Sequence, residues 1–208
     1  TIRQSLFLVA RQASGYAAAQ NTRITSGKYM ESRKHRVAIL ALENFVPFDF
    51  GIPYNMFGQA ELADGSKPYA VYCCGTSETV RNGGVCLCGN APLSALSEAD
   101  TIVIPGITGA QEYKNEDVFS SLRGAAARGI RIASICTGAW ILASSGLLDG
   151  LTATTHWEEA EAMSKAYPLV KIEPETLFVD NGKILTSAGL ASGMDLCLHM
   201  IRQDYGTA

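Results

Sequence analysis

The chain has 208 residues, of which 47% are hydrophobic and 18% charged, and its net charge is −3. This composition suits one folded domain with a substantial core. No run approaches the roughly 20 consecutive apolar residues of a membrane-spanning helix, so we expect a soluble, cytoplasmic protein that does not contact a membrane. The cysteines lack the paired C-x-x-C spacing of a zinc site, and we expect neither a metal nor a cofactor.

The charge is unevenly distributed along the chain. Residues 1–36 carry a net charge of +6 and residues 37–208 carry −9, and a body this acidic is a poor surface for nucleic acid. Residues 1–29 are acid-free and rich in Ser, Ala and Arg, which also suits an organelle transit peptide. Because Met30 opens a short charged lead into an apolar strand, we favour residues 1–29 as a cloning-derived or upstream extension. Residues 30–208 would then form the domain, with its folded part starting near Arg36.

Apolar runs of strand and helix period alternate along the body. The patterns predict strands over residues 37–42, 69–74, 101–105, 130–135 and 152–155, and helices over 51–62, 115–128, 138–148, 157–166 and 192–205. Asn181-Gly182 lies between two apolar runs and predicts a hairpin over 177–187. Alternating strands and helices indicate an α/β fold with a mainly parallel sheet between helices, in which ligands bind beyond the carboxyl ends of the strands.

One cysteine lies where a predicted strand stops and a helix begins. Cys136 follows the strand at 130–135 and precedes the helix that starts at Gly138. A side chain on such a sharp turn stands clear of the sheet, and the first amides of the next helix point at it, which favours thiolate over thiol. The alternative is a small buried cysteine that only packs.

The other cysteines show no such placement. Cys86 and Cys88 would share one face of a strand, whereas Cys73 and Cys74 would point to opposite faces. This pattern suits packing better than bridging, and we expect all six cysteines, including Cys197, to be reduced thiols.

Three further segments end at the same predicted edge of the sheet. Asp49 lies in an apolar loop before a helix, which it could also simply cap. The Gly106 amide could approach a substrate closely, and His156 follows the strand at 152–155, although a lone histidine is often structural. A thiol, a carboxylate, a glycine amide and an imidazole at one edge predict an acyl-transfer or hydration site. The candidate ligand pocket adds the sequence neighbours of these residues, which are Phe50, Ile107, Thr137 and Trp157.

Four blocks of the body carry a family resemblance. They are FVPFDFGIPYNMFG, ADTIVIPG, ASICTGAWILASSGLLDGLTATTHW and LTSAGLASGMDLCLHMIRQDYG. With these blocks the chain resembles the PfpI/ThiJ superfamily, and specifically the amidase-like domain of AraC-type transcription regulators. The resemblance implies a flavodoxin-like three-layer sandwich with a nucleophile elbow, usually dimeric. It also implies that Cys136 takes the nucleophile position, Asp49 the acidic partner position, and the amides of Gly106 and Thr137 the oxyanion hole.

One departure from the pattern bears on function. Peptidase-like and deglycase-like members have histidine directly after the nucleophile, where this chain has Thr137, so proton transfer would fall to Asp49 or His156. The Cys-Thr pair with an upstream Asp also resembles isonitrile hydratase, which is the alternative function. The closing block favours the regulator group, in which a helix-turn-helix domain follows. We therefore expect this chain to be a sensor that binds a small molecule. DNA contact would occur only through such a helix-turn-helix domain, which is absent from this chain.

Overall fold

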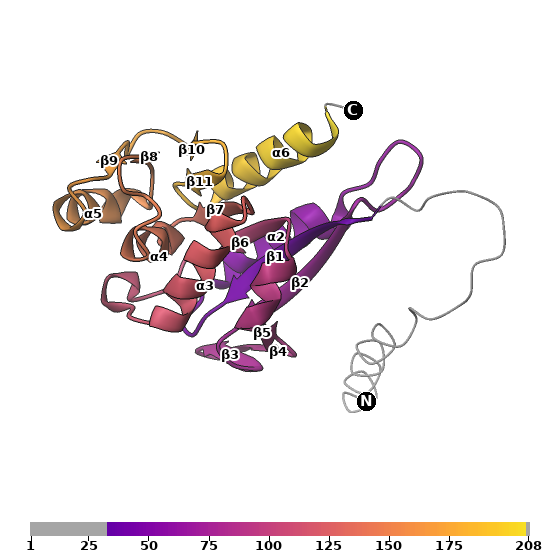
Figure 1. The fold of residues 1–208 in the computed structure, drawn as a ribbon, viewed down its shortest axis with the longest axis horizontal. Helices are drawn as coiled ribbons and strands as arrows, with labels where there is room; N and C mark the ends of the chain where they lie inside the picture. The colour runs from indigo at the N-terminus through magenta and orange to yellow at the C-terminus, as the bar shows by residue number, and fades with distance from the viewer. Residues whose placement is uncertain (1–32, 207–208) are drawn as a thin grey trace. The chain divides into compact units, whose positions relative to one another are not determined.

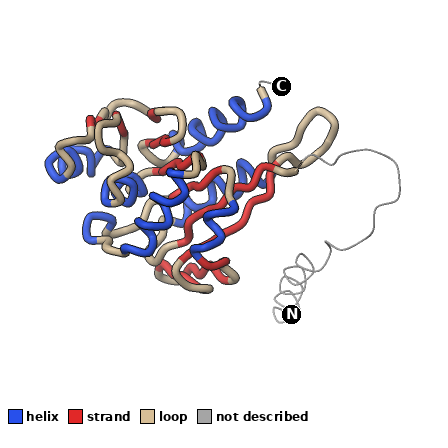
Figure 2. Tube along the Cα trace, in the orientation of Figure 1, coloured by secondary structure: helices blue, strands red, loops and turns tan. Residues whose placement is uncertain are grey.

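A central seven-stranded sheet organises the domain (Figure 1, Figure 2). The computed structural model describes residues 33–206, and the extension expected over residues 1–29 lies outside them. In spatial order the strands are β10 (Phe178–Asp180), β11 (Ile184–Ser187), β7 (Arg131–Ile135), β6 (Thr101–Ile104), β1 (His35–Ala41), β2 (Tyr69–Gly75) and β5 (Ala91–Pro92). All neighbours are parallel except β10 and β11, which form the hairpin predicted from Asn181-Gly182.

Helices cover both faces of this sheet, which gives the three layers. On one face, α2 (Pro47–Gln59) and α6 (Ala191–Tyr205) pack together, and Ile52 and Leu196 join Val103 in one buried cluster. On the other face lie α3 (Glu116–Ala127) and α4 (Gly138–Ser144), whose Leu122 and Ile141 pack with the strands in a second cluster. The predicted three-layer α/β sandwich with a mainly parallel sheet is confirmed (Figure 1).

The remaining elements are short and lie outside the central sheet. Two small sheets are formed by the antiparallel pair β3 (Thr79–Asn82) with β4 (Val85–Cys88), and by the parallel pair β8 (Thr152–Ala153) with β9 (Lys171–Ile172). The short helices are η1 (Leu93–Glu98), η2 (Ala110–Glu112), η3 (Trp157–Glu159) and α5 (Ala160–Ala166). The β3–β4 hairpin and β5 were not predicted from the sequence.

Four predicted elements differ from the observed ones. The helix expected over 157–166 is divided into η3 and α5. Helix α2 begins at Pro47 rather than at residue 51, because proline is tolerated in a first helical turn. Helix α4 ends at Ser144 rather than at 148, since Gly146 adopts a φ of 76° and stops it. The strand expected over 152–155 is a two-residue strand outside the central sheet. The residue after this strand is bonded to the central sheet through a side chain, since the Thr154 amide donates to Thr186 Oγ1 of β11.

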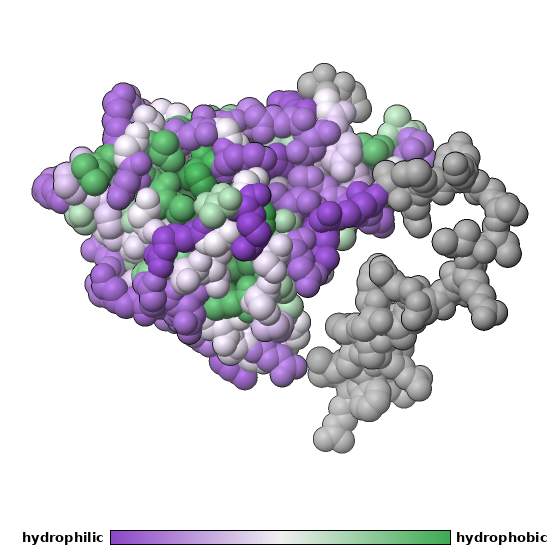
Figure 3. Space-filling model, viewed as in Figure 1, coloured by the Kyte–Doolittle hydropathy of each residue, from purple (hydrophilic) through white to green (hydrophobic). Residues whose placement is uncertain are grey.

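The surface in view is mostly polar. Figure 3 shows hydrophilic residues over most of this face, with hydrophobic residues in small separate groups. Within residues 33–206, no helix combines the length and the apolar character that crossing a membrane requires. The described part of the chain therefore buries its apolar residues mainly in the two clusters beside the sheet.

Helix α4 approaches the neighbouring strand β6 so closely that its first residue must lack a side chain. A Cβ at Gly138 would lie 2.4 Å from the carbonyl oxygen of Ile104. We expect Gly138→Ala to lower the free energy of unfolding by about 1–3 kcal/mol, because backbone has to move to admit the methyl group. Urea denaturation measures this change.

Gly58, in helix α2, offers a matched control because a Cβ there would meet nothing within 4 Å. We expect Gly58→Ala to leave stability unchanged or to raise it slightly, since alanine favours the helix. Equal effects of the two substitutions would contradict the close approach of α4.

Candidate functional site

The turn between β7 and α4 carries Cys136 in the left-handed region of backbone space. Its φ is 56°, which is costly for a residue other than glycine. Hydrogen bonds hold the turn on both sides: the Cys136 amide donates to Ser187 O at 3.0 Å, and Thr155 Oγ1 donates to Cys136 O at 3.1 Å. Gly189 leaves room for the Cys136 side chain, since a Cβ at position 189 would lie 2.6 Å from the Cβ of Cys136. The sharp turn expected at Cys136 is confirmed.

Asp49 lies beside the thiol, in the first turn of α2. Its side chain does not cap the helix, so the capping alternative is wrong. The residue is 1% exposed, and neither carboxylate oxygen has a hydrogen-bond partner of ordinary geometry among the described residues. Burial raises the pKa of Asp49, against the lowering influence of the Cys136 thiol and of the Leu190 and Gly106 amides, which lie nearby. The chain therefore holds an unsatisfied carboxyl group at a costly position.

The protonation of Cys136 is the reverse of what we expected from the sequence. Burial raises the pKa of Cys136 to about 12, and the carboxylate of Asp49 adds to the rise. The Thr137 amide acts in the opposite direction but does not outweigh them. Helix α4 has only seven residues, and its dipole is opposed by an adjacent negative charge. Burial and the neighbouring carboxylate thus favour the thiol of Cys136 at neutral pH, against the thiolate predicted from the sequence.

A cleft of about 500 Å³ opens over this pair. It brings together five of the predicted site residues, and it does not include Phe50, Gly106 or Trp157. Phe50 is buried against the ring of Phe45, and Trp157 is 69% exposed. The residues that line it are Val46, Asp49, Ile107, Thr108, Gly109, Ala110, Gln111, Glu112, Cys136, Thr137, His156, Glu158, Glu159 and Leu190.

His156, the Thr137 hydroxyl and Gly106 each have a contact other than the thiol. His156 faces Glu158, with Nδ1 and Oε2 3.8 Å apart, and among the described residues no hydrogen bond joins His156 to Cys136. The Thr137 hydroxyl accepts from the Ile107 amide and donates to the Ile107 carbonyl oxygen, each at 2.9 Å. Gly106 lies behind the carboxylate, where a Cβ would be 2.4 Å from Asp49 Oδ2. Catalytic roles for these residues stay predictions.

Sequence reasoning missed the acidic rim of the cleft. Glu112 is the last residue of η2, and Glu158 and Glu159 lie two and three positions after His156. Leu190 was also missed, and it adopts a φ of 50° before helix α6. The only signal in the sequence was proximity, since these residues lie within a few positions of Gly106, His156 and the closing helix.

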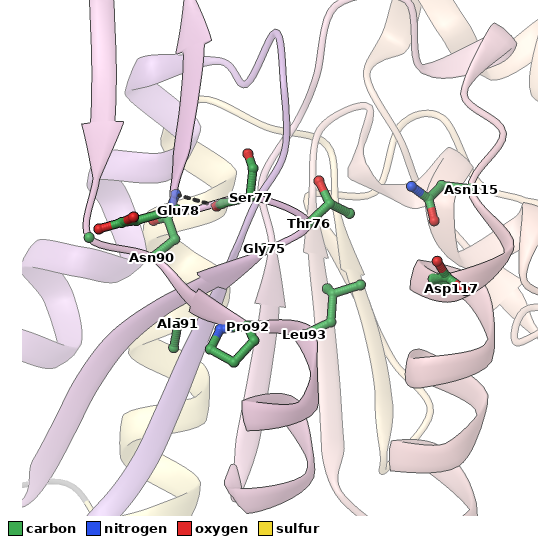
Figure 4. A pocket seen from close by; sticks show the side chains of 11 residues that line it. Gly75, Thr76, Ser77, Glu78, Asn90, Ala91, Pro92, Leu93, Asn115 and Asp117 are labelled. Atoms are coloured by element: carbon green, nitrogen blue, oxygen red, sulfur yellow. Dashed lines mark hydrogen bonds between the residues drawn. The ribbon is translucent and has the colours of Figure 1, made fainter.

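A second cleft, of about 520 Å³, lies at the base of the β3–β4 hairpin. Figure 4 shows Ser77, Glu78 and Asn90 on one side and Asn115 and Asp117 on the other. No cysteine or histidine lines it, whereas Cys136 and His156 line the first cleft. The thiol chemistry suggested by the sequence therefore belongs to the cleft over Cys136.

Comparison with known protein families shows which family this chain belongs to. The model of the DJ-1/PfpI family matches residues 35–203. The chain belongs to the DJ-1/PfpI family. The resemblance of the four sequence blocks is thus confirmed, and the structure places Cys136 at the elbow of a DJ-1/PfpI domain.

Relatives of this DJ-1/PfpI domain include regulators and an enzyme. The HTH-type transcriptional regulator GbdR of Pseudomonas aeruginosa is 27% identical over 172 residues, which cover 82% of this chain and 47% of GbdR. Isonitrile hydratase of Pseudomonas putida is 31% identical over 108 residues, covering 51% of this chain and 46% of the enzyme. The crystal structure of an AraC family transcriptional regulator from Pseudomonas putida has a TM-score of 0.73 at 25% identity, covering 83% of this chain and 93% of that one. The chain spans about half the length of these two curated relatives.

The buried carboxyl group of Asp49 makes stability depend on pH. Its pKa in the folded chain lies above the ordinary value of 3.8, so its contribution to stability is present below that value and is lost as the pH rises through the folded pKa. We expect Asp49→Asn to raise Tm at pH 7 and to have a smaller effect near about pH 3.5. Thermal unfolding followed at both pH values measures the difference.

Asp64 serves as the control, because it is exposed and its pKa is lowered by the hydrogen bonds from Ser66. We expect no gain in Tm at pH 7 from Asp64→Asn. A fall in Tm for Asp49→Asn at pH 7 would show that the carboxylate is stabilised rather than held under strain.

Proposed function

We propose that this chain is the ligand-sensing domain of a cytoplasmic AraC-type transcription regulator. The observation that carries the proposal is the Cys136–Asp49 pair, which lines a preformed cleft and in which burial and the carboxylate favour the protonated thiol. A protonated thiol is a poor nucleophile, whereas a sensor needs only a cleft whose occupation favours one conformation. The relationship to GbdR over most of this chain supports the regulator reading.

The charge of the cleft supports a ligand that carries a positive group. Four carboxylates line it, on Asp49, Glu112, Glu158 and Glu159, and no lysine or arginine is among the lining residues. Asp49 is buried on the floor without an ordinary hydrogen bond, so a cationic group that reached it would find an unpaired partner. Glu112 and Glu158, which are exposed, would attract a cation to the mouth of the cleft.

Two partners follow from the same proposal. DNA contact would belong to a helix-turn-helix domain outside this chain, since residues 37–208 carry a net charge of −9. A homodimer is supported by apolar side chains left exposed on the paired helices α2 and α6. Phe48 and Tyr54 are each 52% exposed, and Met194 is 41% exposed.

Isonitrile hydration is the second candidate function. It is favoured by the contact between Cys136 and Asp49, because a thiol that adds to the isonitrile carbon requires a neighbouring group to carry the proton. The enzyme of Pseudomonas putida that bears this name is 31% identical over 108 residues.

The proposed ligand class can be tested with matched probes. Small alkylammonium ions are compared by calorimetry with neutral isosteres in which carbon replaces nitrogen. We expect only the cations to bind, with an affinity that falls as salt is added, because the rim is exposed. Asp49→Asn and Glu158→Gln should weaken binding about tenfold or more, whereas Glu175→Gln, an exposed carboxylate outside the cleft, should not. Equal binding of the neutral isosteres would contradict the electrostatic account.

An activity assay separates the two candidate functions. The purified chain is incubated with a simple alkyl isonitrile, and formation of the N-substituted formamide is followed. We expect no turnover above that of Cys136→Ser, since burial and Asp49 favour the protonated thiol at neutral pH. Robust turnover that Cys136→Ser and Asp49→Asn both abolish would establish the hydratase instead.

A further inference from the structure

The β3–β4 hairpin has one apolar face and one polar face. Val80 pairs with Leu87 across the hairpin, and both pack toward the core. On the opposite face Arg81 pairs with Cys86, and Thr79 pairs with Cys88. The two cysteines share a strand face as the sequence predicts, but this face does not pack into the core. Packing therefore does not account for them.

The two thiols are in direct contact. Cys86 Sγ and Cys88 Sγ lie 3.1 Å apart, and Cys88 is exposed whereas Cys86 is half-buried. The hydrogen bond between them raises the pKa of Cys86, and the positive charge of Arg81, which faces it, opposes that rise. The remaining four cysteines lie outside this hairpin. Cys73 is half-buried, and Cys74, Cys136 and Cys197 are buried. An exposed thiol with a second thiol in contact is the arrangement that disulfide exchange requires.

We propose that Cys86 and Cys88 form a redox-active dithiol that closes to a disulfide by exchange with a low-molecular-weight disulfide such as oxidised glutathione. In the first step one cysteine, as its thiolate, attacks a sulfur of the small disulfide. A mixed disulfide forms, the original sulfur–sulfur bond breaks, and one small thiolate leaves with the electron pair. In the second step the other cysteine attacks the protein sulfur of the mixed disulfide and releases the second small thiolate.

The exchange balances in electrons and protons. Two protein thiols are oxidised to one disulfide, and the small disulfide is reduced to two thiols. The two protons that Cys86 and Cys88 lose are taken up by the two leaving thiolates. No other oxidant is needed.

The position of the pair makes the disulfide reversible. Alternate residues of a strand have Cα atoms about 6.6 Å apart, near the upper end of the range that disulfides span. The sulfurs need to approach by only about 1 Å to reach bonding distance, and the bridge would hold β4 near the largest Cα separation that a disulfide allows. A disulfide under such strain, and exposed to solvent, is more readily reduced than a structural one. The hairpin would thus respond to the ratio of oxidised to reduced small thiols.

The experiment treats the reduced 208-residue chain with oxidised glutathione, blocks free thiols with iodoacetamide and maps the peptides by mass. We expect the peptide that contains Cys86 and Cys88 to lose two hydrogen atoms and to carry no glutathione, while Cys73 and Cys136 are recovered as alkylated or free thiols. Dithiothreitol should restore both thiols. Two free thiols, or a bridge from either cysteine to another position, would overturn the proposal.

Single substitutions distinguish exchange between neighbours from independent modification. In Cys86→Ser or Cys88→Ser the remaining cysteine has no resolving partner, so glutathione should stay attached to it. Cys73→Ser, at a half-buried strand position, is the control and should leave formation of the bridge unchanged. Stable glutathione on both cysteines of the wild-type chain would show that they react separately and would also overturn the proposal. Circular dichroism confirms that each variant is folded.

Discussion

The backbone of Cys136, held in the left-handed region, is the constraint on which the site depends. Strand β7 passes into α4 through only two residues, Cys136 and Thr137, and Cys136 adopts a φ of 56° there. That conformation persists because Ser187 and Thr155 bond to its amide and carbonyl groups. Those two partners come from β11 and from the segment after β8, so distant parts of the chain stabilise one turn. Gly189 completes it by leaving room for the cysteine side chain.

The turn brings the thiol against a carboxyl group that the fold leaves without ordinary hydrogen bonds. Two acidic groups in one buried place cannot both ionise cheaply, and burial raises the pKa of Asp49 and of Cys136 alike. In many cysteine enzymes an imidazole in contact with the thiol resolves this conflict. Here His156 faces Glu158, and the residue after the cysteine is Thr137, whose hydroxyl is bonded to Ile107. The arrangement suits recognition of a cation by the carboxylates better than attack by sulfur.

The sequence predicted the fold well because its signals were local. Strand and helix periods, the Asn181-Gly182 turn and the strand–cysteine–helix joint depend on neighbouring residues, and the structure contains all three. The protonation of Cys136 could not be predicted in this way, since it depends on burial and on Asp49, which lies 87 positions earlier. The acidic rim was missed for the same reason: Glu112 and Glu158 are far apart in the sequence and line one cleft only in the folded chain. The β3–β4 hairpin was missed because its strands are too short for a clear period.

The protonation state of Cys136 separates a sensor from a cysteine enzyme, and a pH titration of thiolate ultraviolet absorbance tests it directly. The signal of the wild-type chain is compared with that of Cys136→Ser, so that the difference reports this one cysteine. We expect no difference between about pH 6 and pH 9, with the thiolate forming only at higher pH, in line with a pKa of about 12. A thiolate that appears in the difference signal below about pH 8 would contradict it and would return Cys136 to the role of a nucleophile.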